Sequence, residues 1–515
     1  MSSENGNAAA WFVDRHVVEG RGDKPAFVEC GGGRTLTYGA LAERSARMAG
    51  LHARLGLQPE DRVAMIMLDD VDFPVIFWGS LKAGVIPVPV NTLLSADYYE
   101  IILADSRVKA VFVSPELLPA VEPVLARCPS VRHVFVVGGV TGEHSAFEPE
   151  LADSEPAPTR EALADECAFW LYSSGSTGRP KGVRHVHGSL KATADTFGDK
   201  VLGIREHDVV LSAAKLFFAY GLGNAMTFPM AAGATAALYR GRPTPETMFQ
   251  SMAEIGPTLF CAVPTLFAAM LAHARDAKPA GLERLRLCVS AGEALPQEVG
   301  KRWKTLTGVD ILDGVGSTEM LHIFLSNQPG DIVYGTSGVA VPGYVVKLVD
   351  ETGAEVTAAG QVGELLVNGP SAAENYWNQR EKSRATFEGR WTRTGDKYER
   401  TPEGRYVYCG RTDDMFKVSG IWVAPFEVEQ ALISHTDVLE AAVVPHRDAD
   451  GLEKPFAFVV LKGNAEGDVA ETLKAHVKER IGAWKYPRWI RIVPDLPKTA
   501  TGKIQRFKLR EELEA

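Results

Sequence analysis

The sequence lacks the features of a secreted protein or of a structural metal site. Its 515 residues include six cysteines, at positions 30, 128, 167, 261, 288 and 409, and none forms a CxxC pair. Such scattered cysteines are typical of small buried side chains in a reducing compartment, not of a disulfide framework or a zinc site. The segment from Met1 to Asn7 has neither the basic nor the apolar region of a signal peptide. We therefore expect a cytoplasmic protein.

Long apolar runs and an excess of positive charge are also missing. The most apolar stretch, residues 75–90, is interrupted by Lys82, Pro87 and Pro89, so we expect no membrane span. The formal net charge of −10 argues against a general nucleic-acid surface. No internal repeat or low-complexity segment is present. With 45% hydrophobic and 23% charged residues, the composition is that of a globular enzyme with ample core.

Helical and strand patterns alternate through the N-terminal part of the chain. Residues 37–56 predict a helix capped by Thr37, and the continuous apolar run 62–68 is typical of a strand buried on both faces. The same alternation continues with predicted helices at 74–83 and 98–104 and predicted strands at 86–90 and 109–113. It favours an α/β fold with mostly parallel sheets and flanking helices. The Pro- and Glu-rich segment 148–164 is predicted to be a surface loop.

Glycine-rich loops follow several predicted strands. Such junctions occur at 168–182, 215–223, 285–296 and 310–319. In open α/β sheets, ligands bind beyond the carboxyl ends of the strands. We therefore expect these loops to converge on one crevice.

The loop after the predicted strand 168–172 has the composition of a phosphate-binding loop. Residues 173–182 contain three serines, one threonine and three glycines, and Lys181 within them supplies a cationic arm. Exposed backbone N–H groups and hydroxyls of this kind wrap phosphate oxygens. The loop is not a Walker A motif, because Lys181 lies between Pro180 and Gly182. A flexible linker would share the serines and glycines but seldom carries Arg-Pro-Lys after a buried strand.

The pattern changes near Gly410, where a polar stretch precedes a compact α+β unit. We expect residues 1–410 to form a large N-terminal domain, 411–414 a hinge and 415–515 a small mobile domain. The small domain has predicted helices at 425–433 and 469–481 and predicted strands at 439–444, 455–461 and 489–493. Residues 471–515 hold eleven Lys and Arg against six Asp and Glu. On charge alone, this tail is equally consistent with a solvated helix face and with a site for a polyanion.

The segment from Tyr172 to Gly182 resembles the signature loop of the adenylate-forming superfamily. That superfamily includes acyl- and aryl-CoA synthetases, peptide-synthetase adenylation domains and firefly luciferase. Further resembling motifs follow in the same order, at 290–293, 316–319, 393–396, 410–420 and 497–503, so that the resemblance spans residues 35–510. It implies that the protein uses ATP and CoA as co-substrates and Mg²⁺ as a cofactor.

The resemblance implies roles for particular residues. Lys503, Lys417, Thr318 and Glu319 would be catalytic, Glu319 would also bind magnesium, and Asp413 would be the hinge pivot. The residues implied for ATP are Ser173, Ser174, Gly175, Ser176, Thr177, Gly178, Lys181, Ser290, Ala291, Gly292, Glu293, Asp313, Gly314, Thr318, Asp396, Arg411 and Lys503. Glu319 could alternatively be a carboxylate at the start of a helix, and Asp396 could be only a turn residue.

Two segments, 217–224 and 316–327, are similar to benzoate–CoA ligases in particular. The resemblance implies a short, flat cavity for one aromatic ring, lined by Phe218, Ala219, Tyr220, Gly221, Val315, Gly316, His322 and Ile323. For His322, a buried structural histidine is an equally weighted alternative. The CoA candidates are Lys485, Tyr486, Arg488 and Trp422.

The expected activity is the conversion of benzoate, ATP and CoA to benzoyl-CoA, AMP and pyrophosphate. A ligase preferring a hydroxy-, amino- or halo-benzoate is the nearest alternative. An NTP-driven phosphotransferase or hydrolase and a non-catalytic nucleotide-binding protein are the rival classes. The expected partners are the small-molecule substrates alone, without nucleic acid or membrane, and a homodimer is left open.

Overall fold

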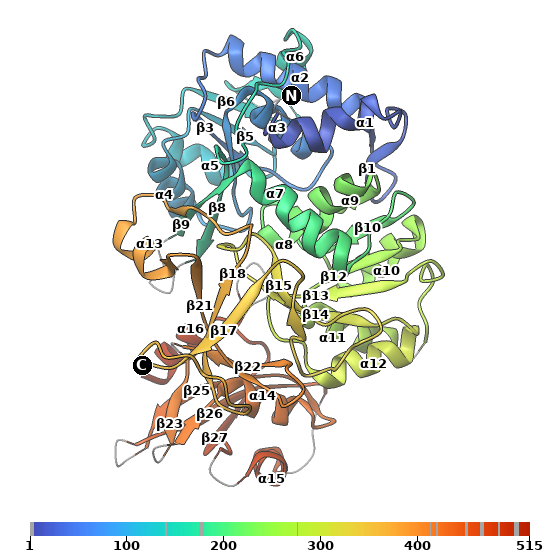
Figure 1. The fold of residues 1–515 in the computed structure, drawn as a ribbon. Coiled ribbons are helices and arrows are strands. Elements are labelled where there is room, and N and C mark those ends of the chain that lie inside the picture. The colour runs from blue at the N-terminus through green and yellow to red at the C-terminus, as the bar shows by residue number, and fades with distance from the viewer. Residues whose placement is uncertain are drawn as a thin grey trace.

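Two largely parallel β-sheets form the core of the N-terminal part of the chain (Figure 1). The computed structural model describes residues 5–139, 142–174, 180–275, 277–412, 414–418, 421–448, 452–463, 468–482, 485–498 and 504–514. The predicted α/β class with mostly parallel sheets is confirmed.

The larger of these sheets has nine strands within the described residues. Their order is β16 (Val339–Ala340), β15 (Ile323–Ser326), β14 (Ile311–Gly316), β13 (Leu287–Ser290), β12 (Leu259–Ala262), β10 (Val209–Ser212), β11 (Thr235–Leu238), β1 (Pro25–Glu29) and β2 (Thr35–Thr37). The strands from β14 to β1 in this order pair in parallel, and the outer ones are antiparallel. The carboxyl ends of β12, β13 and β14 therefore lie at one edge.

The second sheet is wholly parallel across its described strands. Its order is β4 (Ile86–Pro89), β3 (Arg62–Ile66), β5 (Ala110–Val113), β6 (His133–Val136) and β7 (Ser145–Ala146). It lies at the top of the view in Figure 1 with α2 (Tyr38–Arg54) and α3 (Asp72–Ala83). Thr37 caps α2 as predicted, because its side chain accepts a hydrogen bond from the N–H of Ala40.

The other helices cover the sheets or connect their strands. Their bounds are α1 (Arg15–Val18), α4 (Ala96–Ser106), α5 (Leu118–Leu125), α6 (Phe147–Ala152), α7 (His187–Thr193), α8 (Ala219–Leu222), α9 (Phe228–Ala232), α10 (Pro245–Ile255), α11 (Pro264–Ala274), α12 (Gln297–Thr307) and α13 (Arg380–Thr386), with π-helical turns at Ala10–Asp14, Ala194–Val201 and Gly223–Thr227. Every helix in the described part of the chain falls short of the length or apolarity required to span a bilayer.

Four smaller sheets contain the other described strands, and two of them lie in the C-terminal part of the chain. One sheet contains β17 (Val345–Val349), β18 (Gly363–Asn368), β20 (Phe387–Glu388), β21 (Trp391–Arg400) and β22 (Tyr406–Arg411). Another contains β8 (Cys167–Ser174), β9 (Pro180–Val186) and β19 (Asn375–Tyr376). The C-terminal elements are β23 (Phe416–Val418), β24 (Ile421–Val423), α14 (Pro425–Ile433), β25 (Val438–Arg447), β26 (Glu453–Leu461), α15 (Val469–Ile481), β27 (Trp489–Ile492) and α16 (Arg506–Glu514). All five predicted elements of this part are present.

Two predictions of local structure are wrong. The segment 148–164 is not loop throughout, because α6 runs to Ala152; Pro149 is tolerated in its first turn, where its missing N–H has no helical partner. The segment 215–223 contains no strand. Its backbone turns after β10, where the N–H of Leu216 donates to the Asp69 carboxylate at 3.2–3.3 Å, and then enters α8.

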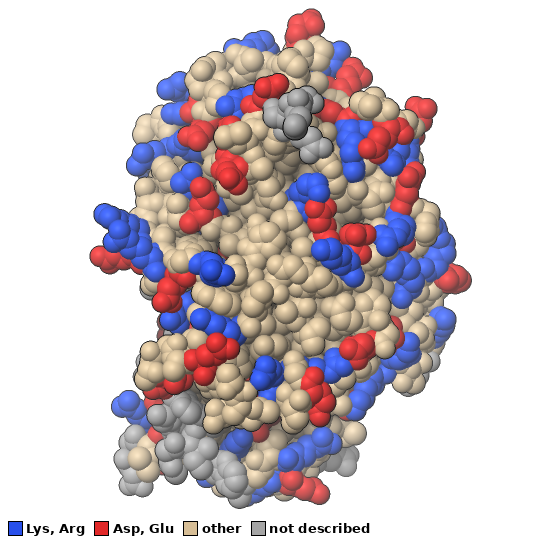
Figure 2. Space-filling view, viewed as in Figure 1, with Lys and Arg blue, Asp and Glu red and all other residues tan. Residues whose placement is uncertain are grey.

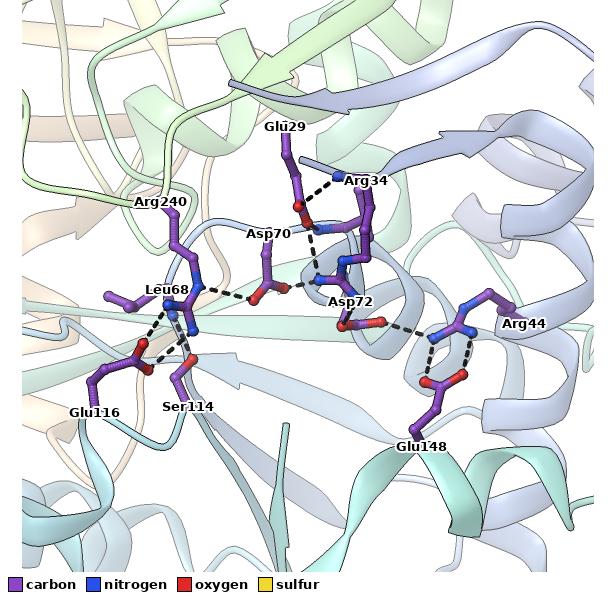
Figure 3. Close-up of polar contacts among 11 residues, drawn as sticks. Glu29, Arg34, Arg44, Leu68, Asp70, Asp72, Ser114, Glu116, Glu148 and Arg240 are labelled. Atoms are coloured by element: carbon purple, nitrogen blue, oxygen red, sulfur yellow. Dashed lines mark hydrogen bonds and ion pairs between the residues drawn. The ribbon is translucent and has the colours of Figure 1, made fainter. Parts of the chain in front are cut away.

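A network of carboxylates and arginines joins the two parallel sheets (Figure 3). At its centre, Asp72 is 3% exposed and accepts hydrogen bonds from Arg34 at 2.7 Å and Arg44 at 2.8 Å. Arg34 follows β1, whereas Arg44 lies on α2 and also pairs with Glu148 on α6 at 2.7 Å. The network therefore fixes the β1–β2 edge of one sheet against the helices that cover the other.

We predict that Asp72→Asn destabilises the protein much more than Glu148→Gln. Removing one partner of a buried ion pair costs about 3–5 kcal/mol, and we expect the lower end, because both arginines reach water. Glu148 is 60% exposed, so its loss should cost about 0–1 kcal/mol. Urea denaturation of the full chain, followed by tryptophan fluorescence, measures both free energies of unfolding. Equal losses would show that Asp72 does not anchor the network.

Candidate functional site

The predicted phosphate loop connects the two strands of a β-hairpin. Strand β8 pairs antiparallel with β9, and Ser173 lies opposite Lys181. Gly175, Ser176, Thr177 and Gly178 lie outside the described residues, as does the side chain of Ser174. The hairpin presents Lys181 immediately after the loop.

Lys181 contacts two residues that are distant in the sequence. Its Nζ lies 3.2 Å from Oε1 of Glu319 and 3.3 Å from the hydroxyl of Tyr376. The Tyr376 hydroxyl donates to the same Oε1 at 2.7 Å, and Nζ lies 4.4 Å from the centroid of its ring. The side chains of Lys181 and Glu319 are 12% and 15% exposed, so water screens their ion pair only weakly. The structure thus brings the predicted phosphate lysine and the predicted magnesium ligand together.

Glu319 is held as an ionised carboxylate. Burial alone would raise its pKa, but the charge of Lys181 and the Tyr376 hydrogen bond outweigh this effect and lower it. The residue lies in a turn between β14 and β15, so the helix-start alternative does not apply. Within the described residues, no three His, Cys, Asp or Glu side chains form a metal cluster. The single carboxylate of Glu319 fits magnesium, which usually takes one or two carboxylates and completes its shell with phosphate and water.

A buried histidine supports the neighbouring Thr318. His185 Nε2 lies 2.8 Å from the carbonyl oxygen of Thr318, and its ring stacks on Phe169 with centroids 5.2 Å apart. Burial lowers the pKa of His185 to about 4, so the ring is neutral at pH 7 and Nε2–H donates to that carbonyl. β9 therefore positions both residues of the 318–319 turn, through His185 and Lys181.

Polar groups without protein partners occur at two of the predicted nucleotide loops. Within the described part of the chain, Ser173 Oγ and Ser290 Oγ are buried and have no hydrogen-bond partner. Ser290 ends β13 directly beside Asp313 of β14. Asp313 accepts the N–H of Leu295 at 3.2 Å, and burial raises its pKa. Because buried polar groups are seldom left unpaired, these hydroxyls fit a ligand rich in hydrogen-bonding groups, such as a nucleotide.

Asp396 and Arg411 meet on neighbouring strands. They lie opposite each other on β21 and β22, and Arg411 Nη1 donates to Asp396 Oδ1 at 2.9 Å. Gly395 has a φ of +70°, and a Cβ atom there would lie 2.9 Å from Arg411 Nη2. Asp396 is therefore part of an ion pair and not simply a turn residue.

The C-terminal part of the chain contacts the loop at residues 290–293, which the resemblance implies in ATP binding. The backbone N–H of Ile504 donates to Oε1 of Glu293 at 3.0 Å. Lys503, which precedes Ile504, lies outside the described residues, as does Asp413. Glu293 therefore connects the loop after β13 to the segment that follows Lys503.

Tyr220 and His322 lie together among the predicted aryl-pocket residues. The Tyr220 hydroxyl donates to the carbonyl of Val289 at 2.9 Å, and its ring centroid lies 5.7 Å from that of His322. His322 Nε2 lies 3.3 Å from the Tyr220 carbonyl, and Phe197 and Phe228 flank its ring. Burial lowers the pKa of His322 to about 3. His322 is thus a neutral, buried histidine within an aromatic cluster.

The other predicted pocket residues flank this pair. Gly316 lies opposite Ile323 across β14 and β15, at an irregularity in register after Val315. A Cβ at Gly316 would lie 2.5 Å from the His322 carbonyl oxygen, so only glycine fits there. Ala219 and Gly221 lie on α8, and Phe218 is its N-cap residue.

The structure describes the side chains of only some of the CoA candidates. Tyr486 stacks with Arg488, whose guanidinium carbon is 3.7 Å from the ring centroid. Lys485 Nζ pairs with the Glu427 carboxylate at 2.6 Å. The backbones of Lys417 and Trp422 face each other in β23 and β24, and their side chains lie outside the description.

Sequence reasoning missed Tyr376 and His185. Each contacts a residue of the 318–319 turn more than 50 positions away along the chain, and such a contact leaves no local pattern. A histidine on a strand directly after the phosphate loop was the one available signal for His185. Tyr376 offered none.

Comparisons with known proteins identify the family of this chain. The family model for "AMP-binding enzyme" matches residues 14–377, and that for its C-terminal domain matches residues 427–503. This chain belongs to the AMP-binding enzyme family.

Several members of the AMP-binding enzyme family are similar over nearly the whole chain. A 4-hydroxybenzoate–CoA/benzoate–CoA ligase of Rhodopseudomonas palustris is 54% identical, over 98% of this chain and 94% of that protein. A benzoate–CoA ligase of Thauera aromatica is 55% identical, over 98% and 96%. The crystal structure of a benzoate CoA ligase from Burkholderia xenovorans LB400 has a TM-score of 0.91 at 48% identity, covering 98% of this chain and 99% of that one. That of the anthranilate CoA ligase AuaEII with anthranoyl-AMP has a TM-score of 0.95 at 40% identity, covering 99% and 97%.

Proposed function

We infer that this chain is an AMP-forming aryl-CoA ligase that converts benzoate, ATP and CoA to benzoyl-CoA, AMP and pyrophosphate. The observation that carries the inference is the 54–55% identity, over almost the full length, to two ligases whose names include benzoate. A 3-hydroxybenzoate ligase and an anthranilate ligase are 32% and 35% identical. The alternative of a hydroxy-, amino- or halo-benzoate preference is therefore not favoured.

The chemistry requires an activated acid. A carboxylate is a poor electrophile, so its oxygen must become a good leaving group before a thiol attacks. Attack of benzoate on the α-phosphorus of ATP forms benzoyl-adenylate and releases pyrophosphate. CoA then displaces AMP to form the thioester. Both steps build charge on oxygens, which preorganised donors stabilise.

The residues around Glu319 have groups suited to the first step. The loop after Ser173 and the ammonium of Lys181 would hold the phosphates, and Thr318 would contact the α-phosphate. Glu319 would hold magnesium, which supplies positive charge to the phosphate oxygens when it is bound. Asp396 would bind the ribose, Arg411 would lie near the ribose or a phosphate, and residues 290–293 would contact the adenine. Asp313 and Gly314 would also belong to the nucleotide site.

The aromatic cluster around His322 supports a site for one ring. Tyr220 would form one wall, Gly316 would admit the ring edge and Ile323 would close the end. Because His322 is neutral and packed among aromatic residues, it would present an uncharged ring to the substrate.

The division into domains follows from the same family. We propose a large domain at 1–410, a hinge at 411–414 with Asp413 as its pivot, and a small domain at 415–515. The Ile504–Glu293 hydrogen bond supports an adenylation pose, in which the segment after Lys503 lies against the adenine loop. Rotation about the hinge would then present Lys417, with Trp422, Lys485, Tyr486 and Arg488 near CoA.

Surface charge is consistent with small-molecule substrates. On the face shown in Figure 2, the described Lys and Arg side chains alternate with Asp and Glu, and a band of uncharged residues crosses the middle. Nucleic-acid-binding proteins instead carry a continuous patch or stripe of Lys and Arg on one face.

Product analysis tests the proposed reaction. With ATP, benzoate and CoA, the protein should release AMP and pyrophosphate and form a thioester that requires benzoate. Release of ADP or phosphate would indicate a phosphotransferase or hydrolase. Nucleotide binding without any product would indicate a non-catalytic nucleotide-binding protein.

His322→Ala should change which benzoates are preferred. We expect relative kcat/KM values among ring-substituted benzoates to shift by about tenfold, because one altered apolar contact is worth about 1–3 kcal/mol. His52→Ala is the matched control, since His52 is also buried but contacts Ser80 where α2 packs on α3, outside the predicted pocket. An unchanged ranking together with a raised KM for ATP would contradict the assignment.

Lys503 and Lys417 should serve different half-reactions. Lys503→Ala should slow benzoyl-adenylate formation by about 10²–10³-fold, the cost of one lost charge-stabilising donor, and spare thioester formation from supplied adenylate. Lys417→Ala should do the reverse. Pyrophosphate exchange measures the first half, and single-turnover thioester release measures the second. Equal loss of both halves in Lys503→Ala would contradict domain alternation.

A further inference from the structure

Tyr376 is fixed where two segments of the chain meet. It lies opposite Val183 in the pairing of β19 with β9, and its N–H donates to Ser383 Oγ at 3.0 Å. Its ring is 4% exposed and packs against Phe387, with centroids 5.3 Å apart. The hydroxyl therefore has a defined position before any ligand arrives.

This hydroxyl makes a short hydrogen bond to Glu319. The distance of 2.7 Å to Oε1 is within the range of a neutral hydroxyl donating to a carboxylate. Burial and the charge of Glu319 raise the pKa of Tyr376, so the hydroxyl keeps its proton at neutral pH. Lys181 bonds the same oxygen, and Oε2 receives neither of these contacts.

The two partners of Oε1 will respond differently to a bound triphosphate. Lys181 carries a full positive charge, which phosphate oxygens attract away from Glu319. The hydroxyl of Tyr376 carries no net charge and is tied to β9 and to Ser383 through its backbone. Tyr376 is thus placed to keep donating to the carboxylate if Lys181 turns to bound phosphates.

We propose that Tyr376 is a positioning residue for Glu319. Its hydrogen bond to Oε1 keeps the carboxylate oriented, with Oε2 available to magnesium, while Lys181 exchanges Glu319 for phosphate. The inference rests on the roles proposed above for Lys181 and Glu319, and it adds a residue that acts through Glu319. Hydrogen-bond partners of metal ligands commonly set metal affinity in this way.

Tyr376→Phe tests the proposal, because it removes the hydroxyl and keeps the ring over Lys181. The Mg²⁺ concentration that half-saturates ATP binding should rise by about 10–100-fold. Isothermal titration calorimetry of the full-length protein, without benzoate or CoA, measures this concentration independently of turnover. ATP binding in EDTA and KM for benzoate should stay unchanged.

Tyr38→Phe is the matched control. Tyr38 begins α2 and is fully buried, and its hydroxyl donates at 2.7 Å to the carbonyl of Ala234, which directly precedes β11 and is far from β9 in the sequence. The same magnesium requirement in Tyr38→Phe and Tyr376→Phe overturns the proposal. A loss of ATP binding in Tyr376→Phe that is equal with and without magnesium also overturns it.

Glu319→Gln separates this proposal from the proposed function. If Glu319→Gln keeps the wild-type magnesium requirement, the metal role of Glu319 fails, and the role of Tyr376 with it. If Glu319→Gln raises the requirement and Tyr376→Phe does not, the proposal for Tyr376 alone fails. The double variant should match Glu319→Gln, because the two act as a unit; additive effects overturn the proposal.

Ser383→Ala replaces Tyr376→Phe if the latter does not fold. Loss of the Ser383 hydroxyl releases the Tyr376 backbone N–H, so this variant should also raise the magnesium requirement. An unchanged requirement in a folded Ser383→Ala protein overturns the proposal.

Discussion

One carboxylate oxygen, Oε1 of Glu319, connects three segments that are far apart in the sequence. Lys181 reaches it from β9 and Tyr376 from β19, while Glu319 itself lies in the turn after β14. Backbone hydrogen bonds reinforce the junction, since Ala373 N–H donates to the Glu319 carbonyl at 2.8 Å and Trp377 N–H to that of Gly182 at 2.8 Å. A buried negative charge without such partners would be costly. The ionised form of Glu319 therefore depends on the three segments being packed together, and their packing depends in turn on the charge of Glu319.

The proposed ring site depends on a different constraint, which is the close approach of backbones. A Cβ at Gly221 would lie 2.0 Å from the Lys215 carbonyl oxygen, and one at Gly223 would lie 2.4 Å from the His322 ring. The segment that carries Tyr220 can fold back against the 316–323 hairpin only because these positions have no side chain. Any added atom here would displace the aromatic cluster and not simply narrow a cavity.

The sequence predicted elements whose signal is local. Helices α14 and α15 have the predicted bounds, and Thr37 caps α2, because apolar periodicity and capping residues act within a few positions. Residues 215–223 were misjudged for the opposite reason. Their aromatic composition favours a strand, but a carboxylate 147 positions away, that of Asp69, binds the Leu216 N–H and turns the chain. The pairing of Lys181 with Glu319 was not predicted either, although both residues were, since it spans 138 positions.

The hydrogen bond between Ile504 and Glu293 uses the main chain of one partner and the side chain of the other. The two ends of this contact therefore differ in how they tolerate substitution. At position 504 any residue with a backbone N–H can donate, so proline alone is excluded outright. At position 293 the acceptor belongs to a single carboxylate. This contact between the segment after Lys503 and the loop after β13 therefore depends on which residue occupies position 293, whereas position 504 can vary as long as its backbone N–H remains.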